Sequence, residues 1–479
     1  GPLRSGWRRR APRTPTALNP GSQSPRGWHT LSNASERSIV APWAGTSPAY
    51  AWYVVLVLMV AYTLSFVDRQ ILSLLVVPIK AEFGISDTAI GLLQGLAFAL
   101  FYTFLGLPMG RIVDRYRRIG VIVIGVSLWS IMTVFCGIAR TYTVLFLARM
   151  GVGVGEATLS PGALSILTDY FPKERLGVAL SVYSMGIFIG SGLAFIAGGA
   201  VVEAVASVPA VTIVLLGELA SWRLVFFIVG VPGVLVALLI ATLREPVRTG
   251  VSRRHDGELL HLSVKDVAHE LDRRRGSIGG ICAGMACHAI SMYGLFGWGP
   301  TFLIREFGWS AGQAGVGLGS IVLVAGCGGM YWGGRLCDRW QSSGQREAPL
   351  RVGVWSGFGA SIAAVLAFSA SEPLFAIALI APLVFGLACP IGSMFAALQL
   401  LVPNQVRGQL QALYLFVISL VGITLGPLLP GLLTDYLFAD PMRIGSALAM
   451  SVGISLVGMA LFFRMTFSSY RANYEAMHG

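Results

Sequence analysis

Four charged residues interrupt apolar stretches of this 479-residue chain. Asp68 and Arg69 lie in the apolar run that begins at Tyr50, and Arg149 and Glu156 lie in a later run. A charge in the hydrocarbon core of a bilayer costs at least about 2.5 kcal/mol, so it persists where it pairs, meets water or takes part in function. These four residues are therefore the first candidates for chemistry.

Their spacing predicts that they interact. Asp68 lies about 27 Å along a helix from the start of its span, and Arg149 reaches a comparable depth from the other side. Glu156 follows Arg149 by seven residues, which places both on nearly one helix face. An anionic substrate that draws Arg149 away from Asp68 or Glu156 would leave a buried carboxylate ready to take up a proton. The alternative is a static pair that fixes helix packing.

Composition identifies the class of protein that carries these charges. The chain is 55% hydrophobic and 12% charged, which is typical of a polytopic membrane protein rather than of one soluble core. We expect an all-α membrane protein with twelve transmembrane helices. The apolar runs that could span are 50–79, 87–109, 118–138, 143–169, 176–201, 221–243, 277–304, 311–335, 350–370, 374–400, 407–435 and 441–466. The short segment 202–221, broken by Pro209, is expected to be an external loop or hairpin.

The net charge of +12 does not indicate a nucleic-acid partner, because of where the charge lies. Half of it falls in residues 1–49, a Pro-, Ser- and Gly-rich segment that we expect to be a disordered basic leader. Its first two residues, Gly1-Pro2, resemble the remnant of a tag-cleaving protease site. Loops after even-numbered spans carry 19 Lys and Arg, whereas loops after odd-numbered spans carry five. By the positive-inside rule, both termini and the linker 244–276 are expected to be cytoplasmic.

An internal repeat divides the chain. The loop GRIVDRYRR starts at Gly110, and GRLCDRW starts 224 residues later at Gly334. This predicts two six-helix bundles in parallel repeat, residues 50–243 and 277–466. The linker 244–276 contains apolar residues at helical spacing from Val264 to Leu271, which predicts an amphipathic helix on the membrane surface. Residues 467–479 form a tail.

The repeated motifs resemble a known family. The paired G-R-x-x-D-R loops, the RMGVGVGE stretch from Arg149 and the Gly-rich fifth and eleventh spans are similar to the major facilitator superfamily over residues 50–466. Within it, FVDR in the first span and GLLQGLAFALFYTFLGLPMGRIVDRY from Gly91 resemble the Spinster branch. That resemblance implies proton-linked transport of lipids such as sphingosine phosphate or lysophospholipids, with spans 1, 4, 7 and 10 around a central cavity. One departure is Ser191, which stands where the superfamily's antiporter motif usually has Pro.

The resemblance also implies a conformational latch in the repeated loops. The latch candidates share equivalent positions in the two halves, and a carboxylate there could pair with arginines and a helix N-terminus. They are Gly110, Asp114, Arg115, Gly334, Asp338 and Arg339. The alternative is a set of surface pairs worth under about 1 kcal/mol.

Three further residues are weaker candidates. Tyr62 and Tyr293 could line the cavity and bind substrate, or could simply pack or anchor the helices at the membrane interface. His288 could relay protons or form a hydrogen bond to a neighbouring helix.

None of the four asparagines falls in a predicted span, which argues against a sugar site. One arginine among apolar side chains suits an amphipathic anion instead.

We therefore expect a proton-coupled secondary transporter that moves anionic lipids by alternating access, in a bacterial inner membrane and as a monomer. Asp68, Glu156 and Arg69 are assigned to proton coupling, and Arg149 with Glu156 to substrate binding. Within this class the rival is a carrier of organic anions such as sugar acids or drug-like molecules. Outside it, the rival is a membrane receptor without transport. We expect no metal site, no cofactor besides protons as coupling ion, and no enzyme, because no nucleophile, base or metal cluster is evident.

Overall fold

The computed structural model describes residues 47–206, 211–213, 217–248, 269–402 and 406–478. We call residues 47–248 the N-half and residues 269–478 the C-half. The N-half contains α1 (Pro48–Leu74), α2 (Val76–Phe83), α3 (Asp87–Gln94), α4 (Leu96–Arg115), α5 (Arg118–Ile138), α6 (Tyr142–Glu156), α7 (Leu159–Tyr170), α8 (Lys173–Ser184), α9 (Gly186–Ala206), β1 (Val211–Ile213), β2 (Gly217–Leu219) and α10 (Ser221–Ala241).

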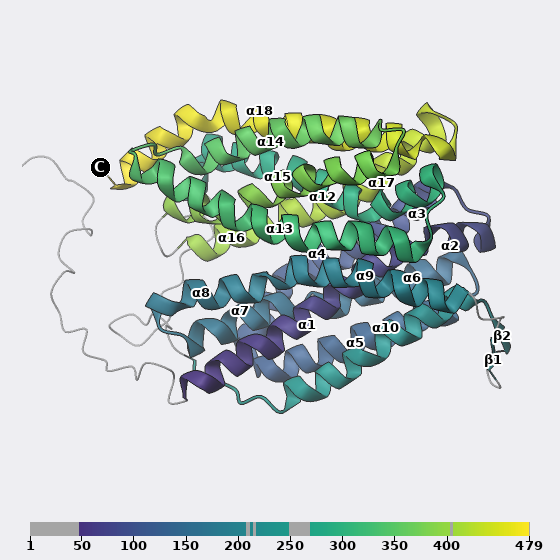
Figure 1. The fold of residues 1–479 in the computed structure, drawn as a ribbon. Coiled ribbons are helices and arrows are strands. Elements are labelled where there is room, and N and C mark those ends of the chain that lie inside the picture. Colours follow the sequence, from purple (N-terminus) through teal and green to yellow (C-terminus); the bar gives the residue numbers. More distant parts are fainter. Residues whose placement is uncertain (1–46, 207–210, 214–216, 249–268, 403–405, 479) are drawn as a thin grey trace, which may run out of the picture. The chain divides into compact units, whose positions relative to one another are not determined.

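The C-half consists of long helices and short irregular turns. They are α12 (Arg275–Phe307), α13 (Ala311–Ser342), α14 (Ala348–Phe368), α15 (Pro373–Leu400), α16 (Arg407–Ile418), η1 (Ser419–Ile423), α17 (Thr424–Leu432), η2 (Leu433–Leu437), η3 (Pro441–Arg443) and α18 (Ile444–His478). In Figure 1 the purple-to-teal helices of the N-half lie together, and the green-to-yellow helices of the C-half lie together. The predicted all-α membrane fold is confirmed.

Eleven helical stretches in the described residues are long and apolar enough to cross a membrane. They coincide with eleven of the twelve predicted spans, so the chain is a multi-pass membrane protein. The remaining span, 143–169, is divided into α6 and α7 by a turn at Ala157 and Thr158. Pro161 explains the turn, because it has no N–H to donate to the carbonyl of Ala157. The count of twelve therefore stays a prediction.

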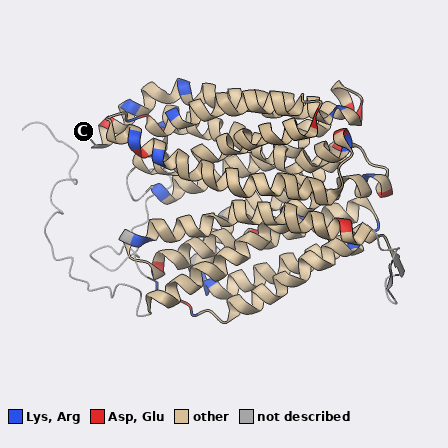
Figure 2. Cartoon of the chain, in the orientation of Figure 1, with Lys and Arg blue, Asp and Glu red and all other residues tan. Residues whose placement is uncertain are grey.

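The two ends of the helices differ in what they carry. We call the side where α1 begins and α18 ends the terminal end, and the side of the β1–β2 hairpin the hairpin end (Figure 1). The hairpin falls in the predicted loop 202–221, and its strands are antiparallel, with Val211 opposite Leu219. Charged residues gather mainly at both ends, while the helices between them are largely uncharged (Figure 2). Which end faces the cytoplasm stays a prediction.

Small residues let the two halves approach closely along α9 and α13. A Cβ atom at Gly199 would lie 2.6 Å from the backbone oxygen of Ala311, and one at Gly319 would lie 2.6 Å from that of Gly192. Any side chain there would collide with backbone, which cannot yield easily. This seam is the membrane counterpart of the small-residue helix interface.

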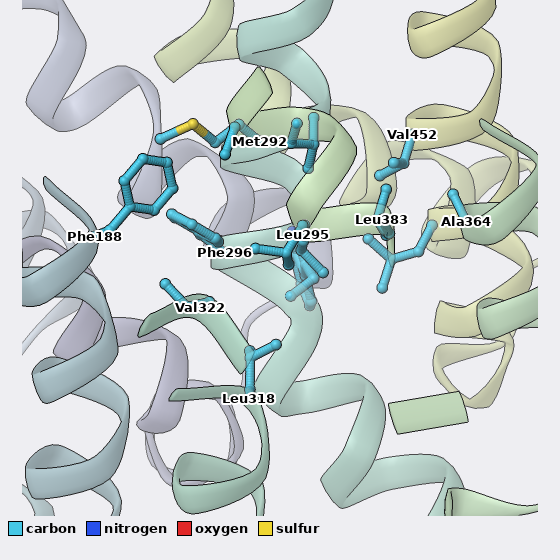
Figure 3. Packing of buried hydrophobic residues seen from close by; sticks show 14 of the residues in the cluster. Phe188, Met292, Leu295, Phe296, Leu318, Val322, Ala364, Leu383 and Val452 are labelled. Carbon is cyan, nitrogen blue, oxygen red and sulfur yellow. The ribbon is translucent and has the colours of Figure 1, made fainter. Parts of the chain in front are cut away.

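Aromatic packing continues the same seam. Phe195 of α9 meets Phe296 of α12 edge to face, with ring centroids 5.9 Å apart. Figure 3 shows Phe188 of α9 beside Met292 and Phe296, with Val322 of α13 nearby. Phe188, Phe195, Phe296 and Val322 are all buried. The hydrophobic core therefore runs across both halves.

Two sequence predictions fall largely outside the described residues. The basic leader 1–49 is described only from residue 47. Val264 of the predicted amphipathic helix also lies outside the described residues. The end of that segment, residues 269–272, is helical, and Leu271 packs against the main hydrophobic cluster.

Candidate functional site

Two ion pairs join α1 to α6. Arg69 donates from Nε to Glu156 Oε2 at 2.7 Å, and its Nη2 lies 2.5 Å from the same oxygen. Arg149 Nη1 lies 3.4 Å from Asp68 Oδ1 and 3.3 Å from the Asp68 backbone oxygen. The predicted proximity of Arg149 and Asp68 is confirmed. Glu156, however, takes Arg69 rather than Arg149 as its partner.

The two arginines are held differently. The Arg69 guanidinium lies 4.9, 4.5 and 4.7 Å from the ring centroids of Phe66, Phe98 and Tyr102, which hold it by cation–π attraction as well as by its ion pair. Arg149 makes only its two long contacts to Asp68, and its Nε has no hydrogen-bond partner in the described residues. Arg149 is therefore the more loosely held cation of the two.

The two acids, Asp68 and Glu156, also differ in how many donors they contact. Asp68 has a second donor, because Thr133 Oγ1 donates to Asp68 Oδ2 at 2.8 Å. Glu156 Oε2 receives only Arg69, and Oε1 has no partner at hydrogen-bond distance in the described part of the chain. The relative exposure of these two acidic side chains is 3% and 0%. Each carboxylate thus depends on one arginine for its charge compensation.

Both arginines face a small cavity between the two halves. Its volume is about 30 Å³, which is room for about one water molecule. The residues on its wall include Arg69, Arg149, Gln94, Tyr293, Gly297 and Pro427.

The three weaker candidates have different surroundings in the structure. Tyr293 lines this cavity, as the sequence suggested it could. Tyr62 instead stacks on Tyr183, with ring centroids 4.7 Å apart. His288 Nε2 lies 2.6 Å from the Leu387 backbone oxygen, so a hydrogen bond between α12 and α15 accounts for this histidine.

The predicted latch makes few contacts in this conformation. Gly110 and Arg115 lie near the terminal end of α4, Arg115 is exposed, and the Asp114 side chain is outside the description. Asp338 and Arg339 are exposed near the end of α13, just after Gly334. Neither Asp338 nor Arg339 has an ion-pair partner in the parts of the chain described. The latch role stays a prediction.

A third charged cluster lies at the hairpin end and was not predicted from the sequence. Arg305 of α12 donates from Nη1 to Asp87 Oδ2 at 2.7 Å and from Nη2 to Asp87 Oδ1 at 2.8 Å. Lys80 adds a contact of 2.7 Å to Asp87 Oδ1. The Asp87 side chain is fully buried. An ion pair therefore bridges the N-half and the C-half here.

A second carboxylate, from the C-half, also contacts the N-half at this end. Asp435 of η2 accepts from the backbone N–H of Thr88 at 2.6 Å and from that of Asp87 at 3.3 Å. These are the first N–H groups of α3, which have no partner within their own helix. We call Lys80, Asp87, Arg305 and Asp435 the hairpin-end clasp. The only signal for this clasp in the sequence was Asp87, an acid that follows Ser86 at the start of a helix.

At the terminal end, two ion networks of the described residues each join residues of one half. Arg118 binds Asp169 and Glu245 in the N-half, with 2.7 Å between Arg118 Nε and Glu245 Oε1. In the C-half, Glu347 binds Arg351 and Arg471. The hydrogen bond from Arg471 holds the pKa of Glu347 down to about 2.

Comparisons with known proteins agree on one kind of molecule. A family model described as Major Facilitator Superfamily matches residues 58–427. An MFS-type efflux pump of Mycolicibacterium smegmatis is 31% identical over 438 residues, covering 88% of this chain and 94% of that protein. Protein spinster homolog 1 of Xenopus tropicalis is 28% identical over 324 residues, covering 64% of this chain and 58% of that protein.

A solved structure gives the same result in three dimensions. It is a bacterial homologue of the human lysosomal transporter Spinster in an inward-facing and unoccupied conformation. It is 28% identical, covers 90% of this chain and 98% of that chain, and has a TM-score of 0.72. This chain is therefore similar in fold over nearly its whole length to that homologue.

Proposed function

Since this chain belongs to the Major Facilitator Superfamily, in its Spinster branch, we propose that it is a proton-coupled secondary transporter of amphipathic anionic lipids. The resemblance expected from residues 50–466 is confirmed, and family and fold point to a transporter rather than an enzyme. The lipid, the proton and alternating access are the parts proposed here.

The observation that carries the proposal is the state of Arg149. This guanidinium is almost fully buried and lines the cavity. Its Nε has no partner in the described residues, and its Nη1 reaches Asp68 at 3.3 Å from the backbone oxygen and 3.4 Å from Oδ1. Buried guanidinium groups bind carboxylate and phosphate through several parallel N–H donors. An anionic head in the cavity would offer Arg149 better contacts than Asp68 does. Substrate binding would therefore draw Arg149 away from Asp68.

Proton coupling follows from the contacts that Asp68 keeps once Arg149 has moved to the substrate. Without Arg149, Asp68 keeps the neutral hydroxyl of Thr133 as donor but loses its charge partner. A buried carboxylate in that position is stabilised by taking up a proton. Glu156 would respond in the same way if the substrate engaged Arg69, its only ion-pair partner in the described residues. Each arginine can thus exchange an internal acid for an external anion.

The direction of opening is part of the same proposal. The hairpin-end clasp joins the two halves at one end, and the similar bacterial structure is inward-facing. Both observations support an inward-facing state in which the hairpin end points away from the cytoplasm. Alternating access then requires the clasp to break and the terminal end to close. The bacterial inner membrane is the location that fits this orientation.

A second candidate remains within the same class. The mycobacterial relative is named an MFS-type efflux pump, which favours export, and a drug-like organic anion is the alternative substrate. Arg149 would serve such a substrate equally well, because it recognises the anionic group and not the tail. Competition in an uptake assay between lysophosphatidic acid and a tail-free sugar acid separates lipid transport from organic-anion transport.

Substitution of Arg149 tests the binding step. In purified protein, Arg149→Ala should weaken binding of lysophosphatidic acid by at least about a hundredfold, because a buried charge-assisted contact is lost. Arg464→Ala removes one exposed positive charge far along α18 and should leave the affinity unchanged. Thermal unfolding would verify that both variants fold. Wild-type affinity in folded Arg149→Ala would contradict the proposed site.

A further inference from the structure

The break between α3 and α4 places a glutamine on the wall of the cavity. Gln94 is the last residue of α3, Gly95 adopts φ −97° and ψ −82°, and α4 begins at Leu96. Neither amide atom of Gln94, Oε1 or Nε2, has a hydrogen-bond partner in the described residues, although both atoms are buried. Because both atoms lack partners, this holds whichever way the amide is oriented.

The packing around Gln94 leaves room for its amide and for little else. A Cβ atom at Gly297 of α12 would lie 2.5 Å from Gln94 Oε1. Beside it, a Cβ at Gly95 would lie 2.7 Å from the Ile423 backbone oxygen, at the end of the π-helical turn η1. Helix breaks and π-helical turns recur at the binding sites of transporters and other proteins. Gln94 therefore sits where two irregular helices meet at the cavity.

The glutamine does not serve as a link between the halves. It reaches the backbone of neither Gly297 nor Pro427 by a hydrogen bond, unlike Thr301, whose Oγ1 contacts the Ser73 backbone oxygen at 3.4 Å. Buried polar groups without partners are rare and costly, so each one needs an explanation. Arg149 Nε is a second such group on the same cavity wall. Both groups therefore lie on the wall of one cavity.

From this geometry we infer that Gln94 binds the substrate head beside Arg149 and selects heads with a hydrogen-bond donor next to the anionic group. The inference rests on the proposed function, and it narrows the substrate class. An ionised phosphate or carboxylate only accepts hydrogen bonds, which suits Arg149 and Gln94 Nε2. Gln94 Oε1 is an acceptor and needs a hydroxyl or amine. A lysolipid or sphingoid phosphate carries that group, and a simple alkyl phosphate does not.

The test uses two lipids that differ in one hydroxyl. The probes are lysophosphatidic acid and its 2-deoxy analogue with the same acyl chain, and their binding is measured on wild type, Gln94→Met and Arg149→Ala. Wild type should prefer the hydroxyl-bearing lipid by roughly tenfold, the value of about one buried hydrogen bond. Gln94→Met keeps the length of the side chain and should bind both lipids equally. Gln341→Met, on the far part of α13, is the matched control and should keep the preference.

The outcomes separate the two proposals. If wild type binds both lipids equally, or if Gln94→Met keeps the preference, the role of Gln94 is overturned while anion binding by Arg149 stands. If Arg149→Ala binds both lipids like wild type, the proposed function fails. Gln94→Leu provides a second variant without the amide should Gln94→Met not fold, and the same loss of preference is expected from it.

Discussion

In the described residues, ion pairs that join the two halves lie at the hairpin end, whereas the terminal-end networks of Arg118 and Glu347 lie within one half. At the hairpin end, Arg305 of the C-half holds the buried Asp87 of the N-half through two hydrogen bonds, and Asp435 caps α3 across the same boundary. At the terminal end, the described ion pairs of Arg118 and of Glu347 join residues within a single half. The contacts of the clasp therefore set the position of the two halves relative to each other, and the terminal-end contacts stabilise each half internally.

This difference shows which contacts must change during transport. A rigid half can rock only if its internal contacts survive, so networks such as Arg118 with Glu245 are expected to persist in every state. The clasp has to break whenever the hairpin end opens. Ion pairs are suited to that use because they are strong when dry and exchangeable with water when exposed.

The largest effect is expected from Asp87→Asn. The substitution keeps the shape of a fully buried side chain but removes the charge that Lys80 and Arg305 share, which should cost the closed hairpin end about 3 kcal/mol. The population should shift toward an open hairpin end by about a hundredfold. Distances between spin labels on Val77 and Tyr436, exposed positions in opposite halves, would show longer separations.

An exposed carboxylate provides the control for Asp87→Asn. Asp272→Asn removes a carboxylate that is 69% exposed at the start of the C-half, and it should leave the distance distribution unchanged. An unchanged distribution in folded Asp87→Asn would mean that the small-residue seam, and not the clasp, closes this end.

A smaller effect is expected from Glu347→Gln, on stability alone. The pKa of Glu347 is about 2, below its ordinary value of 4.5, so its charged form stabilises the fold above about pH 4.5, and this contribution is lost as the pH falls toward 2. The variant should be less stable by about 1 kcal/mol at neutral pH, because Arg471 is half exposed and water screens the pair. Thermal unfolding across this pH range measures the difference, and the Val77–Tyr436 distance should not move. A changed distance would place Glu347 among the contacts that set the position of the halves.

The smallest effect is expected from Asp338→Asn. Asp338 is exposed in this conformation, so its loss should not destabilise the state with a closed hairpin end. If the latch forms when the terminal end closes, the variant should shift the population toward the present state by under about 1 kcal/mol. The same spin-label pair measures this shift, in the opposite direction to Asp87→Asn. No shift would leave Asp338 as a surface charge.

Helix positions were predictable from the sequence because hydropathy and length determine a span almost alone. Eleven spans agree on that basis. The break at Ala157 was missed although Pro161 signalled it, since the run stays apolar on both sides. The β1–β2 hairpin lies in the segment 202–221, for which length and Pro209 predicted a loop or a hairpin, although residues 202–206 continue α9.

It was less predictable from the sequence which charged residues pair with one another. Depth along a helix correctly brought Arg149 to Asp68, but depth carries no information on which way a side chain points. Neighbouring residues such as Asp68 and Arg69 are turned about 100° apart on a helix, so Arg69 could reach Glu156 while Asp68 faced Arg149. The partners Asp87 and Arg305 are 218 residues apart, and no local pattern connects them. Gln94 was overlooked because an uncharged amide does not stand out in an apolar run.

The most direct test of the account is proton movement driven by substrate. Proteoliposomes that contain wild type should show proton flux on addition of lysophosphatidic acid, and an imposed pH gradient should accelerate lipid transport. Asp68→Asn and Glu156→Gln keep the size of the two acids in a form that resembles their protonated state, so both variants should bind lipid without coupled proton movement. If both variants move protons as wild type does, Asp68 and Glu156 are packing residues and the proposed coupling is wrong.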